Sequence, residues 1–146
     1  MIMKKLHFLA LLPVAIFLAN CGDDDNKTVN KHTELAHAWS LTNVSGSIAG
    51  ISKDYEPGTI IWNFNTNNSI ITVVNNNTDE SAPDALDSGV YSYHFVENEI
   101  TPATCSESIE VNEANLGCTS VNGNTLIISM VESDGYQLTF TKMPVD

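Results

Sequence analysis

The stretch GTIIWNFNTNNSIITVV, residues 58–74, decides the fold class of this chain. Large apolar side chains recur at Ile60, Trp62 and Phe64, and a period of two is the pattern of a β-strand with one buried face. Asn67 and Asn68 suit the positive φ angles of a tight turn, and a second apolar run follows over residues 70–74. The stretch therefore predicts two antiparallel strands joined by a short turn.

The same alternation recurs along the chain from residue 36 onward. Short turns link most of the segments, Asn122-Gly123 has the best sequence for a two-residue hairpin turn, and residues 75–88 form a long acidic loop. The expected strands cover residues 37–46, 59–65, 70–74, 89–96, 108–111, 118–121, 125–130 and 136–142. We predict an all-β domain of about eight short antiparallel strands, closed as an up-and-down barrel, with a β-sandwich as the alternative.

The charge balance excludes one large class of partners. Eighteen acidic residues oppose six basic ones, the net charge is −12, and the sequence contains no arginine. Lys4 and Lys5 precede Cys21 and no acid does, so a chain beginning at Cys21 has four basic residues and a net charge of −14. Nucleic acid binding relies on Lys and Arg contacts to phosphate, and attraction to anionic lipid has the same requirement. We expect no nucleic acid partner.

The first residues have the layout of a secretion signal. Lys4 and Lys5 are followed by a largely apolar segment over residues 6–19, which is too short to span a bilayer core of about 30 Å. After Cys21, residues 23–34 are almost entirely polar and lack the apolar surface that folding requires. This region is expected to be a flexible tether.

Two short motifs in this region resemble those of bacterial lipoproteins. The sequence LANC, residues 18–21, resembles a lipobox, in which the cysteine receives a lipid and becomes the first residue after cleavage. Asp23, Asp24 and Asp25 resemble the acidic export signal of Bacteroidota-type surface lipoproteins. The resemblance implies a signal peptide at 1–20, a lipid-anchored acidic tether at 21–35 and a folded domain at 36–146. It also implies attachment to the outer membrane through a lipid, such as palmitate, on Cys21, facing the cell exterior.

The folded part resembles the lipocalin-like domains of bacterial lipoproteins. The similarity rests on AWSLTNVSG at its start, GTIIWNFN, GVYSY in the middle and DGYQLTFTK at its end. Trp39 corresponds to the tryptophan of the first lipocalin strand, and Lys142 is the candidate for the basic residue that packs on it. The family resemblance implies an eight-stranded barrel that binds a small molecule.

Aromatic residues dominate the expected inward face. The candidate ligand-lining residues are Trp39, Trp62, Tyr91, Tyr93 and Phe95. They predict either a site for a small apolar or glycan-like ligand or a plain aromatic core. A cavity behind Tyr91 and Tyr93 would favour a binding protein, whereas a filled barrel would favour a non-catalytic structural, interaction or inhibitor module.

Two further cysteines, Cys105 and Cys118, predict a disulfide if Cys21 carries the lipid, because an even number of thiols then remains in an oxidising compartment. In a simple hairpin they face each other only if the turn is centred between Val111 and Asn112. A later turn would misalign them unless Cys105 precedes its strand, and two unpaired thiols are the alternative.

The sequence shows no pattern of catalytic or metal-ligating residues. His32, His37 and His94 form no ligand pair, and the acids of the long loop lack the ordered spacing of a calcium site. No nucleophile motif and no phosphate-binding glycine loop occurs. We therefore expect no enzymatic activity, no cofactor and no metal.

Overall fold

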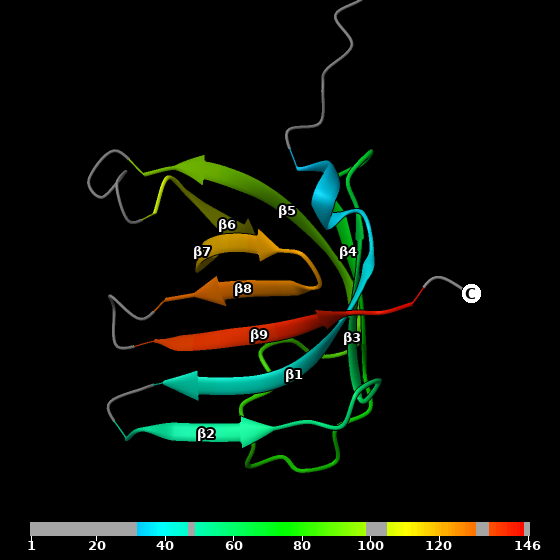
Figure 1. Ribbon diagram of the computed structural model, residues 1–146, viewed down its shortest axis with the longest axis vertical. Coiled ribbons are helices and arrows are strands. Elements are labelled where there is room, and N and C mark those ends of the chain that lie inside the picture. The colour runs from blue at the N-terminus through cyan, green and yellow to red at the C-terminus, as the bar shows by residue number, and fades with distance from the viewer. Residues whose placement is uncertain (1–31, 47–48, 99–104, 131–134, 145–146) are drawn as a thin grey trace, which may run out of the picture.

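The computed structural model describes residues 32–46, 49–98, 105–130 and 135–144. Within these residues, one short 3-10 helix, η1, precedes nine strands that form a single antiparallel sheet (Figure 1). The elements are η1 (Thr33–Leu35), β1 (Ala38–Gly46), β2 (Ile51–Asp54), β3 (Ile60–Asn65), β4 (Ile70–Asn75), β5 (Gly89–Glu97), β6 (Glu107–Val111), β7 (Ala114–Asn122), β8 (Thr125–Ser129) and β9 (Tyr136–Lys142).

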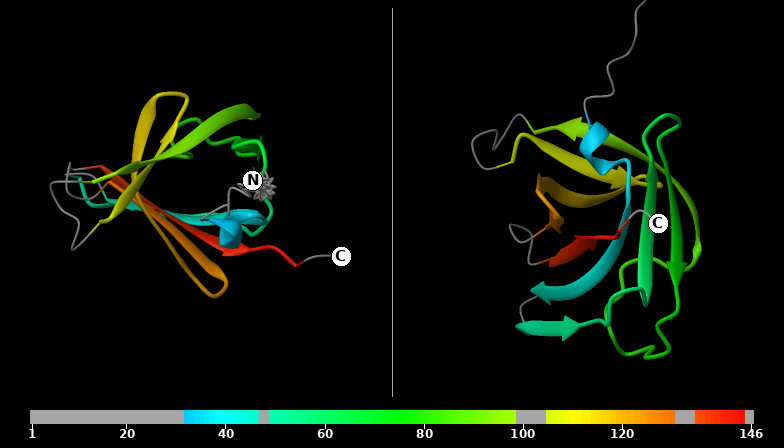
Figure 2. Two further views of the ribbon diagram at one scale, coloured as in Figure 1. Left: turned by 90° about the horizontal axis from the view of Figure 1, so that it is seen from above. Right: turned by 45° about the vertical axis from the view of Figure 1, so that its right-hand side comes forward.

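Eight of these strands close into a barrel. Strand order runs β1-β3-β4-β5-β6-β7-β8-β9, and β9 returns to pair with β1 from Trp39↔Lys142 to Gly46↔Tyr136. The two further views in Figure 2 show the strands curving around one axis. The predicted all-β, up-and-down antiparallel barrel is confirmed, and this closure excludes the β-sandwich alternative.

The additional strand, β2, was not among the expected strands. It pairs with the second half of β1, from Asn43↔Asp54 to Gly46↔Ile51, whereas the first half of β1 pairs with β3. Its four residues contain only one apolar side chain, Ile51, so no alternation marks it in the sequence. β2 therefore pairs with the part of β1 that β3 does not reach. This pairing places the chain between β2 and β3 beside the end of the barrel where β1 finishes.

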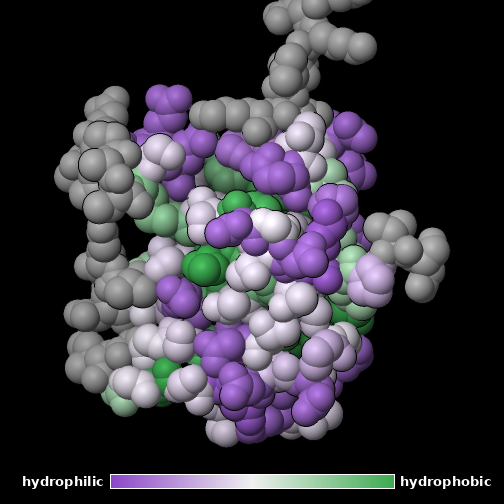
Figure 3. All heavy atoms as spheres, viewed as in Figure 1, coloured by the Kyte–Doolittle hydropathy of each residue, from purple (hydrophilic) through white to green (hydrophobic). Residues whose placement is uncertain are grey.

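Side chains fill the barrel interior. Trp39, Trp62 and Phe140 have no exposed surface, and the ring centroids of Trp62 and Phe140 lie 5.0 Å apart. Each fully buried large apolar side chain contributes about 1.5–3 kcal/mol relative to exposure. Most of the remaining core comes from inward positions of every strand of the barrel except β7 (Leu41, Val44, Ile60, Phe64, Ile71, Val73, Tyr93, Ile109, Val111, Leu126, Ile128 and Leu138). Apolar side chains reach the surface only in small areas of the face seen in Figure 3.

The 3-10 helix η1 closes one end of the barrel. Leu35 is fully buried, and its carbonyl accepts a 3.2 Å hydrogen bond from the indole nitrogen of Trp39. The His32 ring stacks on Phe95 with a centroid distance of 3.7 Å. The described fold therefore begins at His32, before the boundary at Ala36 that composition predicts, because Leu35 supplies an apolar anchor in a polar stretch. All nine strands pair only with one another, so residues 32–144 contain their own core.

Two predicted turns are shifted by one residue or more. Asn122 pairs with Thr125 across the β7–β8 hairpin, so the turn consists of Gly123, with φ of 59°, and the residue after it. Between β3 and β4, the left-handed residue is Ser69, with φ of 55°, rather than one of the two preceding asparagines. Both hairpins form as predicted, but their turn residues differ because strand register, set by burial, decides where each turn falls.

Candidate functional site

A pocket of about 520 Å³ lies at the end of the barrel opposite η1. At this end β1 and β8 finish, and β7 and β9 begin. Nine residues line the pocket: Val44, Pro83, Asp84, Ala85, Leu116, Met130, Gly135, Tyr136 and Leu138. Most are apolar, and the volume falls in the range typical of small-molecule sites.

One wall comes from the paired ends of β1 and β9. Val44 lies opposite Leu138, and both are inward-facing and buried. A bulge at Thr42 shifts the register between Leu41 and Asn43, and this shift turns Val44 toward the interior. The Thr42 hydroxyl donates a 3.1 Å hydrogen bond to the carbonyl of Thr139, which holds the bulge against β9. The bulge therefore extends the apolar inner face of β1 into the pocket.

The second wall comes from β7 and the end of β8. A second bulge in the β6–β7 pairing, between Ile109↔Gly117 and Glu110↔Asn115, contains Leu116. Gly117 has a φ of 99°, and a Cβ atom there would collide with the carbonyl oxygen of Ser129 and lie 2.8 Å from Cγ of Met130. Only glycine permits this close approach. It brings Leu116 and Met130 together at the pocket.

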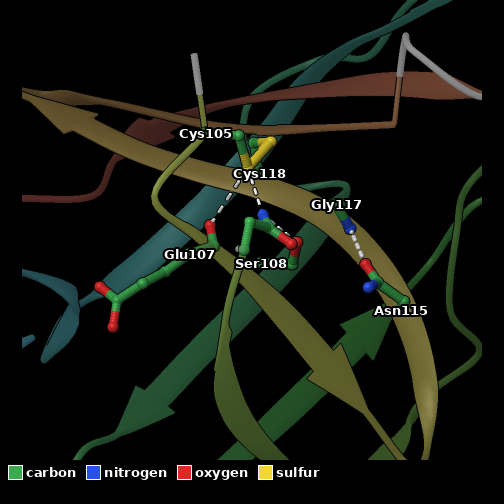
Figure 4. The surroundings of a disulfide bond; sticks show 7 residues. Cys105, Glu107, Ser108, Asn115, Gly117 and Cys118 are labelled. Atoms are coloured by element: carbon green, nitrogen blue, oxygen red, sulfur yellow. Dashed lines mark hydrogen bonds between the residues drawn. A yellow bond between two sulfur atoms is a disulfide. The ribbon is translucent and has the colours of Figure 1, made fainter. Parts of the chain in front are cut away.

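The predicted disulfide between Cys105 and Cys118 is confirmed, with a Cα–Cα distance of 5.6 Å. The hairpin turn lies at Asn112 and Glu113, which have φ angles of 47° and 70°. Cys118 pairs across the sheet with Ser108, and Cys105 reaches it because Cys105 precedes β6 (Figure 4). The turn thus lies later than Val111–Asn112, and Cys105 pairs with Cys118 because it precedes its strand, which was one of the two arrangements expected to allow the disulfide.

Asn98 supports the disulfide from the end of β5. Its side-chain amide donates to Sγ of Cys105 and to the hydroxyl of Ser108, each at 2.8 Å. The backbone N–H of Asn98 donates to the carbonyl of Ser106 at 2.9 Å. The disulfide ties the segment before β6 to β7, the strand that supplies Leu116, and the bonds of Asn98 tie the start of β6 to the end of β5.

The third wall is the loop between β4 and β5. The Tyr55 hydroxyl donates a 2.8 Å hydrogen bond to the carbonyl of Pro83, and the side-chain amide of Asn75 donates to the carbonyl of Leu86 at 2.9 Å. The ammonium of Lys53 lies 3.0 Å from the carboxylate of Asp79. These three bonds hold the loop against β2, the segment after it and the end of β4.

Ala85 gives the loop a sharp turn at the pocket. Its φ is 70°, and the N–H of Leu86 donates to the carbonyl of Asp84 at 3.0 Å. A three-residue turn with positive φ is rare for a residue that has a Cβ, because the Cβ crowds the backbone. The turn places Asp84 and Ala85 on the pocket wall.

The charge of the pocket comes from Asp84. Its Oδ2 accepts hydrogen bonds from the side-chain amides of Asn75 at 2.9 Å and Asn77 at 3.1 Å, which are neutral donors. Burial raises the pKa of the Tyr55 hydroxyl, and the negative charges of Asp84 and Asp79 raise it further. The pKa of Asp79 is lowered by hydrogen bonds from Ser81 and from Lys53. The loop thus presents a fixed carboxylate beside an apolar cavity.

The five aromatic residues predicted to line a ligand site lie elsewhere. Trp39, Trp62 and Tyr93 are buried in the core, and the Tyr93 ring packs edge-on against its neighbours. Tyr91 is partly buried and donates to the carbonyl of Asp87 at 2.9 Å, while Phe95 packs at the end closed by η1. None of the five lines the pocket of about 520 Å³.

The sequence did not identify the residues that line the pocket, although it did indicate the loop and the strands that carry them. The long acidic loop was recognised, but not its contact with the barrel, which depends on Tyr55. Val44 and Leu138 follow the strand alternation and were expected only as part of the strands. The bulges that orient Val44 and expose Leu116 have no periodic signature.

Lys142, the candidate for the basic residue that packs on Trp39, lies opposite Trp39 in the β1–β9 register. Its ammonium, however, lies 2.7 Å from Nε2 of His37. Cys21 and Asp23, Asp24 and Asp25 lie outside the described residues. Among the described residues, none belongs to a helix with the length and apolar character needed to cross a bilayer.

Comparison with protein-family models, with curated proteins and with solved structures finds no match to this chain. The likeness to lipocalin-like lipoproteins therefore rests on the motifs quoted above and on the eight-stranded closure of the barrel.

Proposed function

We propose that this chain is a lipid-anchored, non-catalytic binding protein whose barrel holds a small, largely apolar molecule in the pocket at the end opposite η1. The observation that carries the proposal is the pocket of about 520 Å³. Its walls from Val44, Leu116, Met130 and Leu138 would remove apolar ligand surface from water, which is the main driving force for such binding. The apolar lining favours an apolar ligand over a glycan.

The pocket is also well prepared for binding. The disulfide, the hydrogen bond from Tyr55 to Pro83 and the two bulges fix all three walls before a ligand arrives. A pre-formed site loses less conformational entropy on binding than one that must be ordered by its ligand.

Binding can be tested with an uncharged apolar fluorophore, N-phenylnaphthylamine, added to residues 22–146 of the chain. We expect saturable fluorescence enhancement that weakens at least about tenfold in Met130→Trp, because the indole would occupy the pocket. The matched control is Val90→Trp, at a position that is 66% exposed on β5 and absent from the pocket wall. Equal binding by both variants would contradict the proposed site.

The membrane anchor is the second part of the proposal. The lipobox-like residues 18–21 support acylation of Cys21, and Asp23, Asp24 and Asp25 support export to the outer face of the outer membrane. Several acyl chains anchor a protein far better than one. Cys21→Ser should abolish incorporation of labelled palmitate and release the chain from the membrane fraction. Replacing the three aspartates by asparagine should protect the anchored domain from protease added to whole cells, whereas protection of the unmodified protein would contradict surface display.

The second candidate function is a non-catalytic interaction or inhibitor module. The filled interior around Trp62 and Phe140 favours it, as do the exposed side chains of Val74 and Val90 on neighbouring strands. If this function is correct, the fluorophore will not bind, and Val90→Lys will weaken a protein contact that Met130→Trp leaves unchanged.

A further inference from the structure

The pocket combines an apolar cavity with one fixed negative charge. Val44, Leu116, Met130 and Leu138 form the apolar part, and Asp84 is the acidic residue among the nine that line it. The only other lining side chain with a hydrogen-bonding oxygen is Tyr136, whose hydroxyl can donate or accept a hydrogen bond. A ligand that fills this space therefore meets one acidic residue, Asp84, on an otherwise apolar wall.

The charge of Asp84 has no cationic partner among the described residues. Its Oδ2 accepts only from the neutral amides of Asn75 and Asn77. Of the described lysines, Lys53 pairs with Asp79 at 3.0 Å and Lys142 lies 2.7 Å from His37 near the opposite end of the barrel. The amides fix the orientation of the carboxylate but leave its charge available to a ligand.

The surrounding charge disfavours an anionic ligand. Asp79, Glu80 and Asp87 belong to the same loop as Asp84, and Lys53 is the single described lysine paired with this group. A carboxylate ligand such as a fatty acid would approach like charges, and like-charge juxtaposition is a strong means of rejecting a partner. A cationic group would be attracted to the same region.

From this arrangement we infer that the ligand is a cationic amphiphile, with an apolar body in the cavity and an ammonium group at the Asp84 carboxylate. This inference rests on the proposed binding function and specifies the chemical class of the ligand. An ammonium ion beside an apolar wall loses part of its hydration, and the fixed carboxylate compensates for that loss.

The effect of ligand charge can be measured with three amphiphiles that share an octyl chain and differ in head group. They are cationic octyltrimethylammonium, uncharged octyl glucoside and anionic octanoate. Each is titrated calorimetrically into residues 22–146, below the concentration at which it forms micelles. We expect octyltrimethylammonium to bind at least about tenfold more tightly than octanoate, with octyl glucoside between them. Added salt should reduce this difference, because a partly exposed ion pair is screened.

The variant Asp84→Asn tests the residue. It should weaken octyltrimethylammonium binding by about three- to tenfold and leave octyl glucoside binding unchanged, which also shows that the pocket remains folded. Asp87→Asn is the matched control, because it removes a charge from the same loop at a position that does not line the pocket. It should change the affinity for octyltrimethylammonium by less than about twofold.

The outcomes separate the two proposals. The cationic assignment is overturned if octanoate binds most tightly, or if all three amphiphiles bind equally well and Met130→Trp prevents their binding. In either case the proposed binding function stands. If Asp84→Asn has no greater effect than Asp87→Asn, the role of Asp84 is overturned. If none of the three amphiphiles nor the uncharged fluorophore binds, both the assignment and the binding function are overturned.

Discussion

The hydroxyl of Tyr55 donates a 2.8 Å hydrogen bond to the carbonyl of Pro83 and thereby joins the segment after β2 to the loop between β4 and β5. Tyr55 itself is 8% exposed and belongs to the hydrophobic core. Its backbone N–H donates to the carbonyl of Thr42 at 3.0 Å, at the bulge in β1. One residue therefore connects the core, the bulge and the loop that forms a wall of the pocket.

Removing the Tyr55 hydroxyl should loosen that wall. Tyr55→Phe keeps the buried ring but removes the bond to Pro83, and a hydrogen bond of this kind contributes about 1 kcal/mol. We expect a comparable loss in the free energy of unfolding and about fivefold weaker binding of N-phenylnaphthylamine. Tyr91→Phe is the control, because its hydroxyl contacts Asp87 in the same loop but outside the pocket lining. Equal binding losses in both variants would show that Tyr55 has no special role in holding the pocket.

The same hydroxyl predicts how stability depends on alkaline pH. Burial raises the pKa of both Tyr55 and Tyr93 above the usual 10.0, and nearby carboxylates raise that of Tyr55 further. Because the folded-state pKa is raised, folding favours the neutral hydroxyl of each tyrosine. The stability that comes from this preference is complete below pH 10.0 and is lost as the pH rises toward the folded-state pKa values. Chemical denaturation should therefore show a decline above this pH. The decline should be smaller in Tyr55→Phe and Tyr93→Phe, whereas an unchanged slope in both variants would contradict the assignment.

The disulfide should make a large contribution to stability. Its cysteines are 13 residues apart in the sequence, and the chain-entropy estimate for a loop of this size is about 3 kcal/mol. The double variant Cys105→Ser, Cys118→Ser should lose about this much free energy of unfolding. Treatment with dithiothreitol supplies the control, since it should destabilise the unmodified protein to the same extent and leave the double variant unchanged. Equal melting temperatures of oxidised and reduced protein would refute the contribution.

Gly117 should not tolerate even a methyl group. Its φ is 99°, and a Cβ would collide with the carbonyl oxygen of Ser129. Gly117→Ala combines left-handed strain with overpacking, each costing about 1–2 kcal/mol or more. Gly58→Ala is a matched control, because Gly58 has a φ of 90° but a Cβ there would meet no atom within 4 Å. The extra loss of stability in Gly117→Ala over that in Gly58→Ala measures the cost of the collision. Equal losses in the two variants would contradict this cost and would mean that β7 can move away from β8.

The sequence was sufficient to predict the barrel because burial imposes a period of two on its strands. Ile60, Trp62 and Phe64 are buried as the alternation predicts, and β3, β5 and β9 lie where apolar residues alternate over at least five positions, while β4 lies in a short apolar run. The disulfide followed from the number of cysteines. The strand β2 was missed because four residues with one apolar side chain carry no periodic signal.

The pocket was not predictable on the same basis, since it depends on departures from regular structure. The bulges near Thr42 and Leu116 change which side chains face inward, and neither bulge is marked by a glycine at the bulged residue itself. The positive φ of Ala85 is equally unexpected for its residue type. Alternation correctly predicted that aromatic rings line the interior. It could not show that Trp39 and Trp62 pack so closely that the pocket lies at the end of the barrel instead of between them.

The most direct test of the proposed binding function is to measure contacts between an apolar ligand and methyl groups by NMR. With N-phenylnaphthylamine bound to residues 22–146, we predict intermolecular nuclear Overhauser effects to the methyl groups of Val44, Leu116, Met130 and Leu138. No such effects should reach the exposed methyl groups of Val74 and Val90. Contacts confined to Val74 and Val90, or saturable binding without contacts to the four pocket residues, would contradict the claim that the end of the barrel opposite η1 is the ligand site.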